Sequence, residues 1–204
     1  MITIIIVIIT SIVSVLSFRS RKMFQGLELS PYRILKFNEV HRLLTHAFLH
    51  ADYVHLLINM LVLYFFGTAV ESKFNALQQE GIIFSGRFFF VLLYLGSVLF
   101  SSVSTVFKYR NETTYAAVGA SGAVSAIIFA YIFFAPLAKI YFYMVLPIPG
   151  IVFGILYLVY SSIMTRRSKD HINHEAHFWG AVFGFVFPVL MKPELIKLFW
   201  HAIF

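Results

Sequence analysis

The 204-residue sequence contains no cysteine, and only 12% of its residues are charged. The absence of cysteine excludes disulfide bonds, thiolate metal sites and cysteine nucleophiles. Soluble domains are about a quarter charged, whereas 60% of this chain is hydrophobic and 18% is aromatic. So few charges among so many apolar residues predict an integral membrane protein.

The formal net charge of +7 falls in short segments next to the apolar runs. We therefore expect the lipid bilayer, and not a nucleic acid, as the partner of these charges. No linker or low-complexity segment interrupts the chain, so its length predicts a single membrane domain over residues 1–204. Its core is expected at about 40–190, and residues 191–204 are expected to form a short amphipathic C-terminal tail.

Apolar runs predict six membrane-spanning helices. The first run, residues 1–18, is about 27 Å long as a helix, enough to cross the hydrocarbon core, and it lacks the features of a cleaved signal peptide. A basic, partly apolar loop (19–45) follows, which we expect in the membrane interface. A polar connector is expected at 71–87. The other predicted spans cover residues 54–70, 88–107, 121–134, 150–164 and 174–190.

The predicted fourth helix is unusually short. Residues 121–134 span about 21 Å as a helix, too little to cross a bilayer alone. Residues 115–119 would then enter the membrane as non-helical backbone, which is tolerated only beside protein or a water-filled cavity. The short helix therefore predicts a hydrated cavity with Ser121 at its floor.

Ser121 lies in a run of very small residues, 117–123, at the expected start of this helix. The first turn of a helix has free backbone N–H groups and favours negative charge, and neighbouring glycines let a substrate backbone approach. These are the requirements of a nucleophile whose attack creates an oxyanion. The alternative interpretation is close helix packing through Gly122, Ala126 and Ala130.

Two further polar side chains, His55 and Asn59, lie within the apolar span 54–70. Polar residues in membrane helices are costly and commonly functional. Because they are four residues apart they share one helix face, and both can donate hydrogen bonds, as an oxyanion site requires. A hydrogen bond between two spans is an equally compatible interpretation of this pair.

His177 begins the predicted sixth span beside a second stripe of small residues. Ala176, Gly180 and Gly184 recur every four residues, which lets their helix approach another to backbone contact. The small-residue stripe that follows Ser121 is the obvious partner, and docking the two stripes would bring the His177 imidazole near the serine hydroxyl. Exposure of a helix-end histidine to water is the alternative interpretation.

In combination, these residues resemble the rhomboid family of intramembrane serine proteases. The matching pieces follow the family order over roughly residues 40–187. They are His46-Ala47-Phe48-Leu49-His50, His55-Leu56-Leu57-Ile58-Asn59, Gly67 with Glu71, Gly119-Ala120-Ser121-Gly122, and Ala176-His177 with Gly180 and Gly184. Each piece alone is weak, whereas their occurrence in order at membrane positions is specific.

The resemblance implies an all-α, six-helix membrane fold whose short fourth helix carries the serine. It also implies a serine–histidine dyad that needs no cofactor or metal, with Ser121 as nucleophile and His177 as general base. His55 and Asn59, with Gly119 and the backbone N–H of Ser121, correspond to the oxyanion site. The residues expected to support the scaffold are Arg42, His46, His50, Glu71 (as a charge partner at a helix end), Gly122, Gly180 and Gly184.

The family cleaves transmembrane proteins within or near the bilayer, and these are therefore the expected substrates. It prefers a small residue before the scissile bond and a helix that unwinds easily. The resemblance places the chain as a multi-pass protein in a bacterial-type cytoplasmic membrane, with the active site opening to the extracytoplasmic side. In the orientation of the family, most Lys and Arg residues lie on the extracytoplasmic side. The positive-inside rule therefore favours the opposite orientation.

Two positions depart from the family pattern. The family commonly has a Trp-Arg pair in its first loop, and this chain has His41-Arg42. In some members an aromatic ring one turn after the serine stacks on the catalytic histidine, and that position is Ser125 here. We therefore expect other side chains to orient His177.

Two other functions are compatible with parts of the sequence. His46 and His50 are four residues apart and His174 and His177 are three apart, which are spacings that metal-ligand pairs can use. The run 174–177 nevertheless lacks the His-Glu-x-x-His signature of zinc proteases. The second alternative is an inactive rhomboid-like protein that binds membrane clients, although such proteins usually lack the serine or the histidine.

Overall fold

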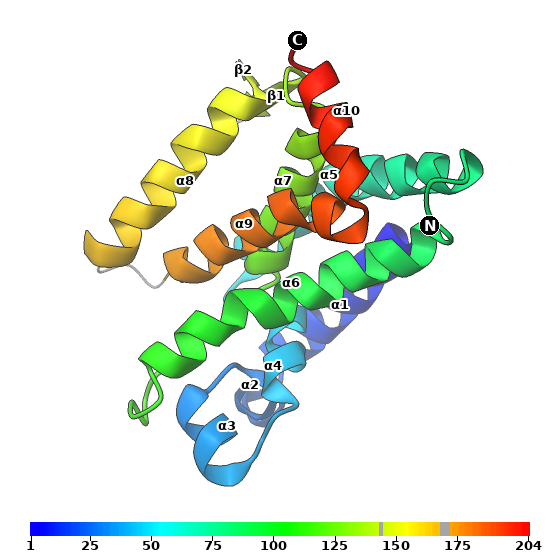
Figure 1. Ribbon diagram of the computed structural model, residues 1–204. Coiled ribbons are helices and arrows are strands. Elements are labelled where there is room, and N and C mark those ends of the chain that lie inside the picture. Colours follow the sequence, from blue (N-terminus) through cyan, green and yellow to red (C-terminus); the bar gives the residue numbers. More distant parts are fainter. Residues whose placement is uncertain (143–144, 168–171) are drawn as a thin grey trace.

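The computed structural model describes residues 1–142, 145–167 and 172–204, which are mostly helical (Figure 1). In chain order the helices are α1 (Ile2–Phe18), α2 (Arg21–Leu27), α3 (Pro31–Phe37), α4 (Arg42–Thr45), η1 (His46–Phe48), α5 (Tyr53–Gln79), α6 (Gly86–Lys108), α7 (Ser121–Phe134), α8 (Gly150–Arg167), α9 (His174–Met191), η2 (Pro193–Leu195) and α10 (Ile196–His201). The helices η1 and η2 are single 3-10 turns.

The prediction of an all-α fold was wrong in one segment. Between α7 and α8, strands β1 (Lys139–Phe142) and β2 (Leu146–Pro149) pair as an antiparallel hairpin. Pro147 and Pro149 lack an amide hydrogen and fix φ, so this segment cannot continue a helix. Pairing in a hairpin satisfies the backbone groups that a helix would otherwise satisfy.

Several apolar helices have the character of membrane helices. Among the described residues, α5 and α6 are long and apolar enough to cross a membrane, and α1, α7 and α8 are shorter apolar helices. The outward faces of α1, α5, α6 and α8 carry large exposed hydrophobic side chains, such as Ile5, Leu57, Phe65, Phe107 and Ile155. Apolar surface on this scale is rare in soluble monomers and marks contact with lipid or protein.

The most enclosed helix of the bundle is α7. It packs against α5, α6 and α9, and most of its residues are buried, as expected for a helix that is apolar on all sides. Its closest neighbour is α9, because a Cβ added at Gly180 would overlap the carbonyl of Gly122 and one at Gly184 would overlap the carbonyl of Ala126. The two small-residue stripes thus meet at backbone contact.

Helix α5 is longer than its apolar run predicted, because it continues through residues expected to form a polar connector. Glu71 and Phe74, both buried, lie three residues apart on one face of the added turns. Glu71 accepts hydrogen bonds from the backbone N–H groups of Ile2 and Thr3 at 2.7 and 2.9 Å. A carboxylate at a helix N-terminus is favourable, so this contact holds α5 against the first turn of α1.

The first loop, between α1 and α5, is built around the buried side chain of Arg42. Its guanidinium donates hydrogen bonds to the carbonyls of Gln25 and Glu28, both at 2.8 Å, and to the carboxylate of Glu39 at 2.5 Å. Glu39 also accepts two hydrogen bonds from Arg33. One buried cation therefore joins α2, the start of α4 and the segment between α3 and α4.

We expect acid to loosen this loop. Hydrogen bonds from Arg33 and Arg42 lower the pKa of Glu39 to about 2 from its usual 4.5. Because the folded-state pKa is depressed, the stabilisation is complete above pH 4.5 and is lost as the pH falls through about 2. In Glu39→Gln, hydrogen–deuterium exchange of peptides from residues 25–42 should be faster at neutral pH, and its acid dependence should weaken.

The control for this experiment is Glu80→Gln, at the end of α5 and far from the loop in sequence. Its exchange over residues 25–42 should equal that of the unmodified protein at every pH. Equal protection of this loop in the Glu39→Gln variant would contradict the role assigned to the carboxylate.

Candidate active site

The structure brings Ser121 and His177 together. Ser121 is the first residue of α7, His177 lies in the first turn of α9, and His177 Nε2 is 2.7 Å from Ser121 Oγ. A hydroxyl and a base within hydrogen-bond reach are the first requirement for activating a serine nucleophile. The contact follows from the backbone packing of α7 on α9, which aligns the beginnings of the two helices.

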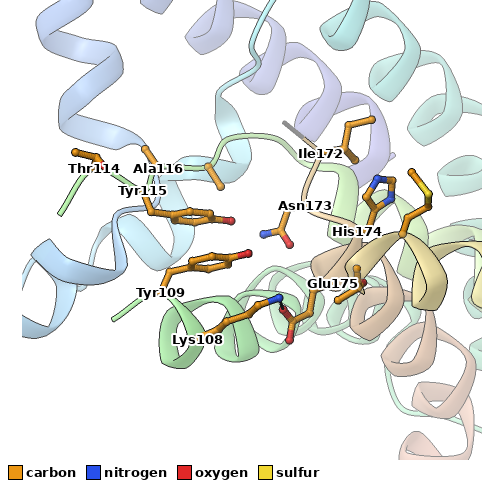
Figure 2. Close-up of a pocket in the computed structure, with 12 residues that line it drawn as sticks. Lys108, Tyr109, Thr114, Tyr115, Ala116, Ile172, Asn173, His174 and Glu175 are labelled. Carbon is orange, nitrogen blue, oxygen red and sulfur yellow. Dashed lines mark hydrogen bonds and ion pairs between the residues drawn. The ribbon is translucent and has the colours of Figure 1, made fainter. Parts of the chain in front are cut away.

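Two contacts with α6 hold the start of α9, and Figure 2 shows one of them, between Lys108 and Glu175. Asn173 caps this helix by accepting a backbone N–H from the first turn at 3.0 Å, and its amide donates to Thr105 at 2.9 Å. Glu175 pairs with Lys108 at the end of α6, with 3.1 Å between Nζ and Oε2. These contacts fix the backbone from which the His177 side chain projects.

The irregular segment before Ser121 is tied to the first loop. Ala117 and Leu29 exchange two backbone hydrogen bonds, of 2.9 and 3.0 Å. Tyr115 stacks on Tyr109 (Figure 2), and their ring centroids are 3.8 Å apart. Backbone pairing of this kind is what non-helical chain at membrane depth requires.

Gly119 provides space beside the serine. Its φ is +125°, a conformation that L side chains rarely adopt. A Cβ at this position would lie 3.4 Å from His55 Nε2 and 3.7 Å from Ser121 Oγ. Its own N–H donates to the carbonyl of His46 at 3.1 Å. Gly119 therefore gives the predicted oxyanion site room and leaves the donation of hydrogen bonds to other groups.

His55 and Asn59 line the same cavity as Ser121 and His177. The N–H of Ala51 donates to His55 Nδ1 at 3.4 Å, so the neutral ring carries its hydrogen on Nε2. Asn59 donates one amide hydrogen to the carbonyl of His55 at 2.9 Å and has a second one. The Ser121 N–H has no intrahelical acceptor, because it begins α7. Three hydrogen-bond donors thus belong to one site.

The cavity has a volume of about 720 Å³, which lies in the usual range for ligand sites. Ser121 and His177 line it, and so do two carboxylates, Glu28 and Asp52. Its walls include the apolar residues Ile58, Val124 and Ile128 from α5 and α7. It can accommodate an extended stretch of polypeptide in a partly apolar setting.

The first two histidines of the sequence pattern support the scaffold. His46 Nδ1 lies 2.9 Å from the carbonyl oxygen of Arg42. Because a carbonyl can only accept, Nδ1 carries the hydrogen. His46 Nε2 lies 3.3 Å from Ser102 Oγ on α6. His50 Nδ1 lies 2.9 Å from Ser14 Oγ on α1. Within the described ranges, no group of three or more His, Asp or Glu residues is placed to hold a metal ion.

Sequence reasoning missed two contacts of this region. The ring of Tyr157 on α8 lies 6.5 Å from that of His177, with 27° between the planes. His41 Nε2 lies 3.2 Å from the carbonyl of Gly26, where the family pattern has a tryptophan. The only signal in the sequence was that His41 and Ser125 stand where family members can have aromatic residues. That signal did not identify the side chains that make the replacing contacts.

The fold and the site define a class: helical membrane proteins with a serine–histidine pair inside the bundle. The chain belongs to the rhomboid family, because the family model for the Rhomboid domain matches residues 38–194. This confirms the resemblance drawn from the sequence.

Relatives from three organisms agree with this family. RHOMBOID-like protein 12, mitochondrial, of Arabidopsis thaliana is 30% identical over 161 residues, or 72% of this chain and 45% of that protein. Presenilin-associated rhomboid-like protein A, mitochondrial, of Danio rerio is 28% identical over 170 residues, or 77% of this chain and 40% of that protein. YdcA of Bacillus subtilis (strain 168), provisionally named a rhomboid protease, is 28% identical over 152 residues, or 73% of this chain and 66% of that protein.

The chain spans less than half the length of the first two relatives. Two of the three carry the word mitochondrial in their names, so these relatives do not support the predicted bacterial-type membrane in particular. Family and apolar helices together establish a membrane protein.

Proposed function

We propose that this protein is a serine endopeptidase that cuts membrane proteins in or near their transmembrane segments. The observation that carries the proposal is the 2.7 Å contact between His177 Nε2 and Ser121 Oγ inside a cavity of a rhomboid bundle. In the proposed mechanism, His177 takes the hydroxyl proton while Ser121 Oγ attacks the scissile carbonyl carbon. The same imidazole then protonates the leaving amine, and a water molecule hydrolyses the acyl-enzyme.

The proposed oxyanion site consists of three donors around the attacking serine. They are His55 Nε2–H, the second amide hydrogen of Asn59 and the backbone N–H of Ser121. Preorganised donors of this kind stabilise the negative charge that develops on the carbonyl oxygen. Gly119 keeps the space open that this oxygen would occupy.

We also propose six membrane crossings, by α1, α5, α6, α7, α8 and α9, in a single domain that ends in the α10 tail. A substrate helix protects its peptide bonds by its own hydrogen bonds, so cleavage requires local unwinding where water and polar partners are present. Because α7 is too short to cross the bilayer alone, Ser121 at its start would lie below the membrane surface. The cavity above it would supply that setting and would open to the extracytoplasmic side.

The test uses the purified full chain in lipid vesicles with a model transmembrane substrate that has small residues near its end. We expect fragments of one defined cleavage site by mass spectrometry, labelling by a fluorophosphonate probe, and no loss of activity with a chelator. Failure of both cleavage and labelling would indicate a client-binding member of the family. Loss of cleavage with chelator would indicate a metal site.

Asn59→Ala should lower kcat by about 10²–10³-fold, the usual cost of one oxyanion donor. KM should change little, because the donor acts on charge that exists only in the transition state. Steady-state cleavage in vesicles measures both constants. Asn111→Ala is the matched control, since Asn111 is an exposed asparagine in the loop after α6 and does not line the cavity. Equal kcat in the Asn59 variant and the unmodified protein would remove Asn59 from the oxyanion site.

A further inference from the structure

Helix α8 contributes Tyr157 to the cavity, where it lies beside His177 and beside Ser125 on α7. The ring of Tyr157 lies 6.5 Å from the imidazole of His177 at 27°, within the range of offset aromatic stacking. Its hydroxyl oxygen lies 2.5 Å from the Oγ of Ser125, one turn after Ser121 on α7. A single residue therefore contacts both helices of the proposed dyad.

The direction of the hydrogen bonds follows from the donors available. Ser125 Oγ lies 2.8 Å from the carbonyl oxygen of Ser121, which can only accept. A hydroxyl has one hydrogen, so Ser125 gives its hydrogen to Ser121 and accepts the hydrogen of Tyr157. A chain of two hydrogen bonds thus runs from α8 to the first residue of α7, and it fixes the position of the Tyr157 hydroxyl.

The environment of Tyr157 explains why the ring stays in place. Gly154, one turn earlier, is buried, and a Cβ there would make ordinary contact at 3.4 Å with Phe129 on α7. The rings of Phe129 and Phe153 lie 5.6 and 5.9 Å from that of Tyr157. Most of α8 is otherwise partly or fully exposed, and Figure 1 shows it at the outer edge of the bundle beside α9.

We infer that Tyr157 is a positioning residue, which holds the His177 imidazole in the orientation that faces Ser121. The ring limits rotation of the imidazole on one side, and the bond to Ser125 keeps the ring there. This inference rests on the proposed protease function and extends it. It makes the seating of α8 on α7 a determinant of the reactivity of the dyad.

Kinetics of ring removal provide the first test. Tyr157→Leu should lower kcat by about 10–100-fold, the scale of a misplaced catalytic group, with KM within about threefold. The acid limb of the kcat–pH profile should shift as well, because the imidazole loses its neighbour. Tyr160→Leu is the matched control, because Tyr160 lies three residues later on α8 and its ring contacts His174. It should leave both constants unchanged.

A double-mutant cycle tests the hydrogen-bond chain with less disturbance of the fold. Tyr157→Phe and Ser125→Ala should each lower kcat by about two- to fivefold, and the double variant should lose no more than the worse single variant. Such non-additivity is expected when two side chains act through one interaction. Independent, multiplicative effects would overturn the proposed chain.

A measurement that does not depend on proteolytic activity tests this inference separately from the proposed protease function. Exchange of the His177 ring C2 hydrogen, followed by mass spectrometry in detergent, reports the surroundings of the imidazole. Tyr157→Leu should change the rate at least twofold, and Tyr160→Leu should not. If the unmodified protein neither cleaves the substrate nor reacts with the probe, the proposed protease function is overturned. The exchange rate of the His177 ring would still show whether Tyr157 orients the imidazole. Unchanged exchange and unchanged kcat in Tyr157→Leu would overturn the inference.

Discussion

Ser121→Ala should abolish cleavage of the transmembrane substrate and labelling by the fluorophosphonate probe. The substitution removes the only atom proposed to attack the carbonyl, and loss of a serine nucleophile costs on the order of 10⁶-fold in kcat in a well-studied serine protease. The fold should persist, because the neighbouring positions of this turn are alanine and glycine and alanine favours helix. Cleavage in vesicles, labelling on a gel and thermal unfolding measure the three properties.

Ser97→Ala is the matched control for this experiment. Ser97 is buried on α6 and its hydroxyl donates to the carbonyl of Tyr94, so the same atom is removed outside the cavity. This variant should cleave and label normally. A Ser121→Ala protein that still cleaves would show that another group performs the chemistry.

Gly184→Ala should destabilise the protein by at least about 3 kcal/mol, the upper end of the usual cost of overpacking. The added methyl group would overlap the backbone carbonyl of Ala126, and a backbone atom cannot turn aside as a flexible side chain can. Helices α7 and α9 would have to separate, which also moves His177 away from Ser121. Thermal unfolding in detergent and probe labelling should fall together.

The control for helix packing is Gly154→Ala on α8. Its added Cβ would lie 3.4 Å from its nearest neighbours, an ordinary contact, and alanine favours helix over glycine. Its midpoint of unfolding should equal or exceed that of the unmodified protein. A Gly184→Ala protein as stable as this control would show that the two stripes do not need backbone contact.

Much of the helical arrangement could be predicted from local patterns. The fourth predicted span, 121–134, has the same limits as α7, because the small residues before Ser121 and Pro136 after Phe134 bound the apolar run. The proximity of Ser121 and His177 also follows from spacing, since two stripes of small residues with a four-residue repeat suit each other.

The features that the sequence did not reveal depend on partners distant along the chain. The resemblance implied that Glu71 is a charge partner at a helix end, and only the fold identifies that end as the beginning of α1. Tyr157 lies in an apolar run, and the pattern of that run does not predict which neighbour its ring contacts. Gly119 was expected within the oxyanion site, and only the fold shows that its N–H is engaged by His46. Such pairings need three-dimensional contacts, which hydrophobic periodicity does not encode.

The meeting of α7 and α9 has a consequence for how catalysis would be organised. Main-chain atoms face main-chain atoms at Gly122 and Gly180, so no side-chain rotamers lie between the helices to absorb a shift. The separation of the proposed nucleophile and base would consequently be built into the resting bundle and would not await induced fit. In the proposed mechanism, the binding energy of an incoming helix is left to offset the cost of unwinding it.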